Sequence, residues 1–243
     1  MRQRKEATTM PHPILFFIRR KTTPFFLAVL GALLLSLGKP GHAVERSDIL
    51  LDIVSHCVNP TVPNYCSSCR APRNDVLCGP ELECKKNTEV WALSDKYTVM
   101  RDIKMCGCPA PFVHGLALPT TPVTGVEDPL RPEGIWAFAW NAGIRRIAPE
   151  HLVLVVNPRL HRSQNQLHVH IVRFAPESRD KLEKENPSYV RNLDAVWATA
   201  AQAAAAKGLE DYGVLVKQAP AGGFWIAVTP YSPEGAFTQW RCE

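Results

Sequence analysis

The chain has 243 residues, of which 46% are hydrophobic and 21% charged, and its formal net charge is +5. This composition excludes an intrinsically disordered chain and a polytopic membrane protein. The positive charge comes from the first 43 residues, which hold 7 basic residues and 1 acidic residue; subtracting them leaves 21 basic and 22 acidic residues, a net charge of −1. A body this close to neutral lacks the basic stripe of nucleic-acid-binding proteins, so we expect no nucleic-acid partner.

The N-terminus has the layout of an export signal. A basic segment, Arg19–Lys21, precedes an apolar run, Phe25–Leu37, and a plausible cleavage site, Gly41–Ala43. This order predicts a signal peptide over residues 1–43, because the run is shorter than the ~20 residues that a membrane-spanning helix needs. An uncleaved membrane anchor is the alternative, since residues 14–18 add hydrophobicity. Either way we expect an exported protein, in the periplasm or at the periplasmic face of the bacterial inner membrane.

All eight cysteines follow the leader. An even number in an exported chain favours disulfides, whose pairing the spacing does not determine. The alternative is a zinc site built from the pairs Cys66/Cys69 and Cys106/Cys108, although this spacing is unlike that of common zinc ribbons. We expect one catalytic domain over residues 44–243, with a Cys-rich insertion at 58–86. The cysteines are Cys57, Cys66, Cys69, Cys78, Cys84, Cys106, Cys108 and Cys242.

Hydrophobic periodicity and turn residues predict the elements that surround this insertion. Helices are expected at 45–55, 134–147, 178–185 and 193–207. Strands are expected at 89–93, 97–102, 113–118, 151–156 and 166–173, with a terminal hairpin at 213–217 and 224–229. Loops are expected at 119–132 and 157–165. Hairpins mixed with helices, without strict βαβ alternation, indicate an α+β fold with an antiparallel sheet and flanking helices.

The candidate catalytic residues are His168 and His170. Side chains alternate along a strand, so both imidazoles and Gln166 share one face, while the intervening apolar residues enter the core. A neutral imidazole nitrogen can attack phosphorus and form an intermediate that water later cleaves. His170 can then contact a non-bridging oxygen or help to protonate the leaving phosphate. Two half-buried structural histidines are the first alternative, and a zinc site is the second.

Polar residues of the preceding loop are candidate ligands of the substrate phosphates, because such donors stabilise developing charge. The zinc alternative lacks an obvious carboxylate ligand close by in the sequence. The isolated histidines His56, His114, His151 and His161 are more typical of structural or surface positions, with His161, in the site loop, the most plausible exception. The candidate phosphate ligands are Asn157, Arg162, Ser163, Gln164, Asn165 and Gln166.

The segment around His168 resembles the histidine triad superfamily of nucleotidyl hydrolases and transferases. Its pattern is His-φ-His-φ-His-φ-φ, and the middle histidine attacks the α-phosphate. The resemblance places Gln166 at the first position, His168 at the nucleophile and His170 at the third. It also matches Asn157 to an asparagine that ends the preceding strand and contacts phosphate. Gln166 departs from the pattern.

The chain is more closely similar to the CDP-diacylglycerol pyrophosphatase family, at the leader and at four later segments in the same order: Ile53–Cys57, Phe138–Trp140, Asn157–Ile171 and Asp211–Val216. This resemblance implies cleavage of CDP-diacylglycerol to CMP and phosphatidate through a CMP–histidine intermediate, with no cofactor or metal, near a membrane surface. The alternatives are a soluble-nucleotide hydrolase of the same superfamily, a disulfide-rich binding module without activity, and a zinc enzyme.

Overall fold

The computed structural model describes residues 46–63, 72–74 and 88–242. The chain divides into two units, Met1–Ala43 and Val44–Glu243, and the second contains everything described below. The predicted leader and most of the predicted Cys-rich insertion lie outside the described residues. Within the described ranges, no helix combines the length and the apolar character needed to cross a membrane.

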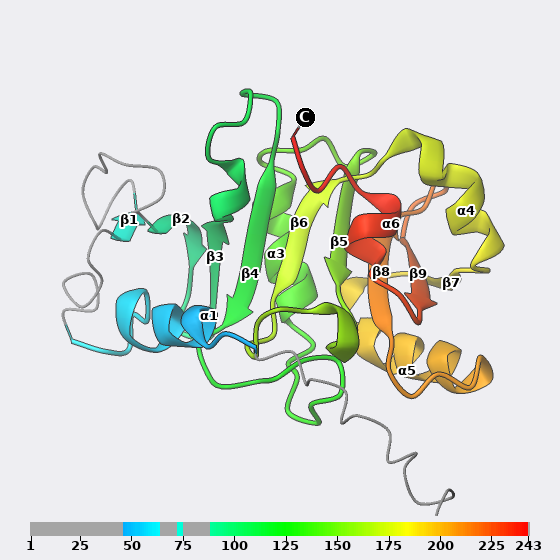
Figure 1. Ribbon diagram of the computed structural model, residues 1–243. Helices are drawn as coiled ribbons and strands as arrows, with labels where there is room; N and C mark the ends of the chain where they lie inside the picture. The colour runs from blue at the N-terminus through cyan, green and yellow to red at the C-terminus, as the bar shows by residue number, and fades with distance from the viewer. Residues whose placement is uncertain (1–45, 64–71, 75–87, 243) are drawn as a thin grey trace, which may run out of the picture. The chain divides into compact units, whose positions relative to one another are not determined.

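A nine-stranded sheet forms the centre of the second unit, in the order β1-β2-β3-β4-β6-β5-β8-β9-β7 (Figure 1). Its neighbours are antiparallel except for β1 and β2. The predicted α+β class with an antiparallel sheet is therefore confirmed. The strands are β1 Pro72–Asn74, β2 Thr88–Leu93, β3 Tyr97–Arg101, β4 His114–Pro119, β5 Leu152–Val156, β6 Val169–Arg173, β7 Ser188–Val190, β8 Gly213–Gln218 and β9 Phe224–Thr229.

Short helices flank the sheet. The predicted N-terminal helix is α1, which continues directly into a π-helical turn at Ile53–Cys57. The α-helices are α1 Ile49–Asp52, α3 Ile135–Gly143, α4 Arg179–Lys184, α5 Val196–Ala206 and α6 Pro233–Phe237, and 3₁₀ turns lie at Ile103–Met105, Arg159–His161, Pro176–Ser178 and Leu193–Ala195.

One face of the sheet is covered by α3 and α5, which lie behind the strands in Figure 1. Apolar residues that alternate along β4, β5, β6, β8 and β9 point to this side. They pack against Trp136 of α3 and Trp197 of α5, whose ring centroids are 4.7 Å apart. Because strand side chains alternate between faces, this large core also fixes which residues of the central strands point the other way.

The opposite face carries two separate, smaller apolar clusters. One lies beneath α1 and its π-helical turn and includes Met100 and Leu116. The other lies beneath α4 and α6 and includes Val155 and Phe237. The helices of the two clusters stand in front of the sheet on either side of its middle strands (Figure 1). The polar residues of β4 and β6 on this face are therefore grouped between two apolar covers.

Four elements differ clearly from the sequence expectations. The strand expected at 166–173 begins only at Val169, because the Gln166 side chain and the backbone N–H of Leu167 bond to the loop that follows β4. The helix expected at 134–147 ends at Gly143, which lies against Leu152 and leaves no space for a larger side chain. Strand β7 and helix α6 were not predicted, since both are too short to show a hydrophobic period.

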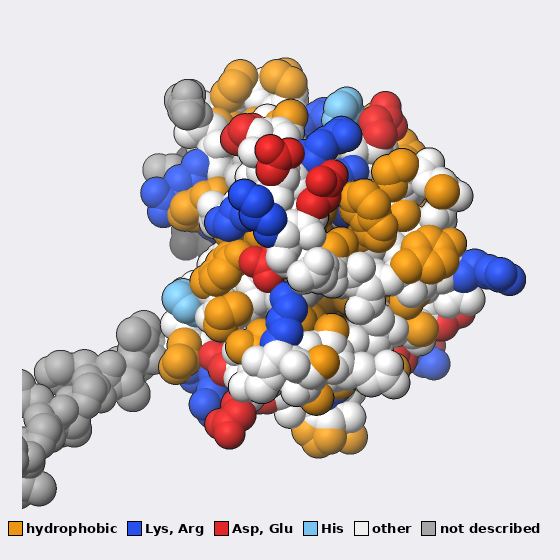
Figure 2. Space-filling model, turned by 90° about the vertical axis from the view of Figure 1, so that its right-hand side faces the viewer, with side chains coloured by type: hydrophobic (Ala, Val, Ile, Leu, Met, Phe, Trp, Pro, Cys, Tyr) orange, Lys and Arg blue, Asp and Glu red, His pale blue; other side chains and the backbone are white. Residues whose placement is uncertain are grey.

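Charge is distributed evenly on the face drawn in Figure 2, where basic and acidic side chains lie among hydrophobic ones. That face carries no continuous basic stripe of the kind that binding to a phosphate backbone requires.

Candidate active site

His168 lies immediately before β6 and faces away from the large core, into which Leu167 and Val169 point. Its Nδ1 is 2.7 Å from the carbonyl oxygen of Gln166. A carbonyl only accepts hydrogen bonds, so Nδ1 carries the hydrogen and Nε2 has a free lone pair. Burial lowers the pKa of His168, which keeps the ring neutral at neutral pH. This is the protonation state that a nitrogen nucleophile needs.

The side chain of Gln166 is hydrogen-bonded to the loop that follows β4. Its amide nitrogen donates to the carbonyl oxygens of Pro119 at 3.0 Å and Thr121 at 2.9 Å, and its amide oxygen accepts from the backbone N–H of Val123 at 3.2 Å. Both amide hydrogens are thereby engaged, so the Gln166 side chain has no hydrogen left to donate to a phosphate. Its role in the site is to hold the backbone whose carbonyl orients His168.

His170 is joined to a histidine on the neighbouring strand. The register of β4 and β6 pairs Leu116 with His170, and His114 is two residues from Leu116 on the same face. His114 Nε2 lies 3.0 Å from His170 Nδ1, and His114 Nδ1 lies 3.3 Å from the carbonyl oxygen of Trp240. Because the Trp240 carbonyl only accepts hydrogen bonds, the single hydrogen of the neutral His114 ring lies on Nδ1, and His114 Nε2 is an acceptor. His170 Nδ1 therefore carries a hydrogen and donates it to His114 Nε2. His170 Nε2 then has a free lone pair, and within the described residues it has no hydrogen-bond partner.

Burial lowers the pKa of His170 well below its ordinary 6.5, although the Glu234 carboxylate acts in the opposite direction. Burial also lowers the pKa of His114, against the raising effect of Asp102. All three imidazoles of the site are thus held neutral at neutral pH. His114, which the sequence grouped with isolated structural histidines, adjoins the two candidate catalytic residues.

Two carboxylates from distant segments complete the cluster. Glu234 Oε1, on α6, is 3.4 Å from His114 Nε2 and 3.5 Å from His170 Nδ1. Asp102 Oδ2, at the end of β3, is 3.4 Å from His114 Nε2. Burial would raise the pKa of Glu234, but His170 and the Lys104 ammonium group, 2.7 Å from Oε1, outweigh it and bring that pKa to about 2. Glu234 is therefore ionised throughout the physiological range.

Asn157 lies where the sequence predicted it, directly after β5. Its Nδ2 donates to Glu234 Oε2 at 2.7 Å, and its Oδ1 accepts from Ser232 Oγ at 2.8 Å. The side chain is buried. Asn157 thus orients the carboxylate that faces His170, and its second amide hydrogen stays available to a ligand in the cleft.

The other predicted phosphate ligands separate into two groups. Arg162 forms a two-pronged ion pair with Glu127, so its charge is already balanced. Asn165 donates to Asp48 Oδ1 at 2.6 Å and thereby holds the start of α1. Ser163 and Gln164 line the cleft described below, as do Asn157 and Arg162.

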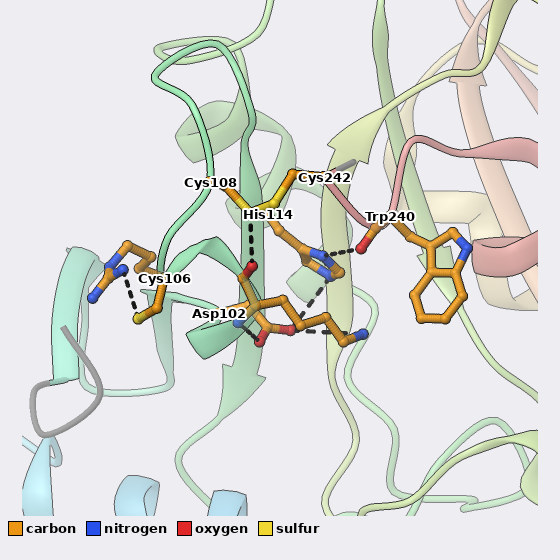
Figure 3. The surroundings of a disulfide bond; sticks show 8 residues. Asp102, Cys106, Cys108, His114, Trp240 and Cys242 are labelled. Atoms are coloured by element: carbon orange, nitrogen blue, oxygen red, sulfur yellow. Dashed lines mark hydrogen bonds and ion pairs between the residues drawn. A yellow bond between two sulfur atoms is a disulfide. The ribbon is translucent and has the colours of Figure 1, made fainter.

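A disulfide secures the C-terminal end of the site. Cys108 is bonded to Cys242, with their Cα atoms 5.7 Å apart, and this bond ties the segment of Trp240 to the loop that precedes β4 (Figure 3). In the same view the His114 ring lies between the Trp240 carbonyl and the Asp102 carboxylate. Cys106 is also disulfide-bonded, and no cysteine of the described ranges is free. The predicted disulfides are confirmed here, and the zinc alternative fails for the Cys106/Cys108 pair; Cys66 and Cys69 lie outside the described residues.

A cleft of about 1050 Å³ opens above these groups. Its polar part is formed by His168, His170 and Asn157, together with Lys104 and Glu234. The remaining wall is largely apolar and comes from α1, its π-helical turn and the strands beside them. A cavity of this size reaches the upper end of the range for small-molecule sites, roughly 300–1,000 Å³.

The cluster also has the donor set of a metal site. One ligand atom each from Asp102, His114 and His170 lie within 4.8 Å of one another, and Glu234 Oε1 adjoins both imidazoles. Two histidines and two carboxylates suit zinc, and the fold thus supplies the carboxylates that were absent nearby in the sequence. The Lys104 ammonium group already sits between the carboxylates, 2.7 Å from Glu234 and 4.0 Å from Asp102. A fixed positive charge therefore competes with a metal ion for this position.

Neutral imidazoles that face a cleft, with carboxylate side chains and an ammonium group beside them, are typical of the active site of a hydrolytic enzyme. Comparison with protein families identifies which one: the family model of CDP-diacylglycerol pyrophosphatase matches residues 81–208, more than half of the chain. The chain belongs to the CDP-diacylglycerol pyrophosphatase family. It hydrolyses the phosphoanhydride bond of CDP-diacylglycerol, as the sequence predicted, and the interpretation as a binding module without activity is set aside. No curated protein matches the chain.

The matched region contains His114, Asn157, His168 and His170 but ends before Glu234. Sequence reasoning missed four groups of the cluster: Asp102, Lys104, His114 and Glu234. A histidine at the start of a strand that is adjacent to the predicted catalytic strand was the available signal for His114. Nothing local marks Glu234, because α6 reaches the site only through packing.

Proposed function

We propose that His168 is the nucleophile that attacks the cytidine-bearing phosphorus of CDP-diacylglycerol, with release of phosphatidate and then of CMP. The observation that carries this proposal is the hydrogen bond from His168 Nδ1 to the Gln166 carbonyl, which leaves Nε2 unprotonated on a ring that lines the cleft. Nucleophilic catalysis replaces one difficult displacement with two easier ones.

In the first step a bond forms between His168 Nε2 and the phosphorus, and the bond from that phosphorus to the bridging oxygen breaks. The electron pair leaves with phosphatidate. A phosphate monoester has a second pKa of about 6, so phosphatidate can leave without receiving a proton. The hydrogen stays on His168 Nδ1, which continues to donate to the Gln166 carbonyl, and this hydrogen bond stabilises the positive charge of the phosphorylated ring.

In the second step water attacks the same phosphorus and the phosphorus–nitrogen bond breaks. His170 is suited to take the proton from water, because its Nε2 carries no hydrogen and burial keeps the ring neutral and able to accept one. The imidazolium that forms is stabilised by the Glu234 carboxylate, 3.5 Å from Nδ1, and by the hydrogen bond to His114. General-base catalysis of this kind contributes about 10²–10⁴-fold.

Positive charge for the diphosphate comes from Lys104. Its side chain is 36% exposed at the cleft, against 4% for Arg162, and its ammonium group has hydrogens to donate beyond the one bonded to Glu234. The amide of Asn157 and the side chains of Ser163 and Gln164 add uncharged donors on the same side of the cleft. Donors that are held in place before the reaction stabilise charge that develops on the phosphate oxygens.

The arrangement supports a relationship to the histidine triad superfamily. His168 and His170 occupy the second and third positions of that pattern, with the alternate residues in the core. Gln166 takes the first position, and His114 adds a third imidazole from the next strand. We propose that the fold is a variant in which the third ring comes from β4.

Two features of the chain bear on where the protein acts. The Cys108–Cys242 disulfide is typical of an oxidising compartment, and the leader has the layout of an export signal. We propose that the enzyme acts in the periplasm or on the periplasmic face of the inner membrane, where its lipid-nucleotide substrate is presented by the membrane surface.

Trapping of the intermediate tests the proposal. CDP-diacylglycerol labelled in the cytidine-side phosphate should transfer label to the wild-type protein on rapid quenching in base, and substrate labelled in the lipid-side phosphate should not. His168→Ala should lose the adduct and lower kcat by roughly a thousandfold or more. His151→Asn, a change at an exposed histidine away from the cleft, is the matched control. An adduct of undiminished yield in His168→Ala would overturn the assignment.

A further inference from the structure

We infer that the apolar part of the cleft is the binding site for the diacylglycerol portion of the substrate, an inference that rests on the proposed position of His168 at the reacting phosphorus. The diacylglycerol is joined to the lipid-side phosphate, one phosphate away from the attacked atom. Its glycerol and the first acyl carbons must therefore lie in the same cleft as His168. The sequence offered no location for them.

The floor of this region is continuous with the catalytic residues. Leu116 is the direct cross-strand partner of His170, and Met100 is the direct partner of Leu116. Paired residues of neighbouring strands point to the same face, with Cβ atoms about 4.5–5.5 Å apart. The sheet therefore changes from imidazole to aliphatic side chains within one strand spacing, and then continues apolar toward its edge.

The wall of this region is formed by α1 and its π-helical turn, which contribute Ile49, Leu50 and Ile53 to the cleft. The start of α1 is fixed to the site loop, since the backbone N–H of Ser47 donates to Ser163 at 2.8 Å. The loop that holds the polar residues and the helix that holds the apolar wall are thus one connected structure.

Exposed hydrophobic residues gather at the mouth of the same cleft. Three of the six large hydrophobic side chains that are exposed in the described ranges line it: Ile49 at 63%, Ile103 at 59% and Leu160 at 72%. They come from three separate segments. Single exposed hydrophobic residues are ordinary, but a group around one opening indicates a surface that is covered when the protein functions.

Two of these residues are held in place by carboxylates. The backbone N–H groups of Arg159 and Leu160 donate to the two oxygens of Asp211, at 2.7 and 3.0 Å, which fixes the turn that presents Leu160. Asp102 accepts from the backbone N–H of Lys104 at 2.9 Å and so begins the turn that presents Ile103. The rim is therefore preorganised, and the order from polar residues to apolar floor to apolar rim follows the order from diphosphate to glycerol to acyl chains.

The test compares substrates with and without acyl chains. Ile49→Gln and Leu160→Gln should each lower kcat/KM about threefold to tenfold for a monomeric dihexanoyl CDP-diacylglycerol, because apolar contact worth about 1 kcal/mol is lost. Hydrolysis of CDP-glycerol, which has no acyl chains, should stay at the wild-type rate. Leu130→Gln is the matched control, since Leu130 is 76% exposed and does not line the cleft.

Each other outcome overturns the inference. Equal losses on both substrates would mean that the changes damage the site in general, and no loss on either would mean that the acyl chains bind elsewhere. Loss only on vesicles, with the monomeric substrate unaffected, would assign these residues to the membrane surface instead. The nucleophile is tested separately, because retained activity in His168→Ala would reject the proposed mechanism while the acyl-chain comparison could still succeed.

Discussion

His114 Nε2 lies 3.0 Å from His170 Nδ1 across the β4–β6 pair, and the far side of the same ring faces the Trp240 carbonyl. This contact fixes the protonation of two imidazoles at once. It leaves His170 Nε2 with a free lone pair, as the proposed role of general base requires, and it makes that protonation state depend on groups contributed by the C-terminal segment.

The first prediction concerns His114. His114→Ala removes the acceptor for His170 Nδ1–H, so hydrolysis of the intermediate should slow more than its formation. We expect kcat to fall about tenfold to a hundredfold while the amount of CMP–protein adduct at steady state rises. Quenched-flow measurement of both quantities checks this. An adduct that falls in proportion to kcat would instead place His114 in the first step.

The second prediction is a change in pH dependence. Glu234 raises the pKa of His170, so Glu234→Gln should lower that pKa. A base is active when it is unprotonated, and the acidic limb of the kcat profile should therefore move to lower pH in the variant. Its kcat on the plateau should also fall, because the imidazolium loses its counter-charge. A profile whose acidic limb stays in place would show that another group titrates there.

The third prediction is acid sensitivity of the fold. The pKa of Glu234 is about 2 in the folded protein against an ordinary 4.5, so its ionised form contributes about 3 kcal/mol to stability, present above pH 4.5 and lost as the pH falls toward 2. The lowered pKa values of His168 and His170 act in the same direction below pH 6.5. Urea unfolding between pH 3 and pH 8 should show this decline, and Glu234→Gln should flatten its lower part.

The fourth prediction concerns the disulfide. The double variant Cys108→Ser/Cys242→Ser should lose about 2–4 kcal/mol of unfolding free energy, because the bond closes a long loop. Its kcat should also fall, since the segment that carries the Trp240 carbonyl is released from the site. Denaturant unfolding together with activity at a temperature where the variant is folded separates the two effects. Full activity in a destabilised variant would make the disulfide purely structural.

The fifth prediction concerns the source of the positive charge between Asp102 and Glu234, which is either the Lys104 ammonium group or a bound metal ion. If Lys104 provides the positive charge between Asp102 and Glu234, treatment with a chelator followed by desalting should leave activity within about twofold. Lys104→Met should lower kcat/KM markedly. Elemental analysis that finds one zinc per chain, together with loss of activity on its removal, would establish the metal alternative.

Features that depend only on neighbouring residues could be predicted from the sequence. Alternation along a strand is a property of neighbouring residues, so the facing of His168 and His170, opposite Leu167 and Val169, followed from the pattern alone. The hairpin of β8 and β9 and the placement of Asn157 at a strand end followed from turn residues and hydrophobic runs in the same way.

The groups that surround His170 could not be predicted in this way, because they are brought together by the fold. Asp102 directly follows β3, His114 begins β4 and Glu234 lies on α6. Their meeting depends on strand order, on register and on the packing of a five-residue helix. It also showed that Arg162 is committed to Glu127 and Gln166 to the loop after β4. Such long-range pairings are set by burial of the whole sheet, and no spacing along the chain encodes them.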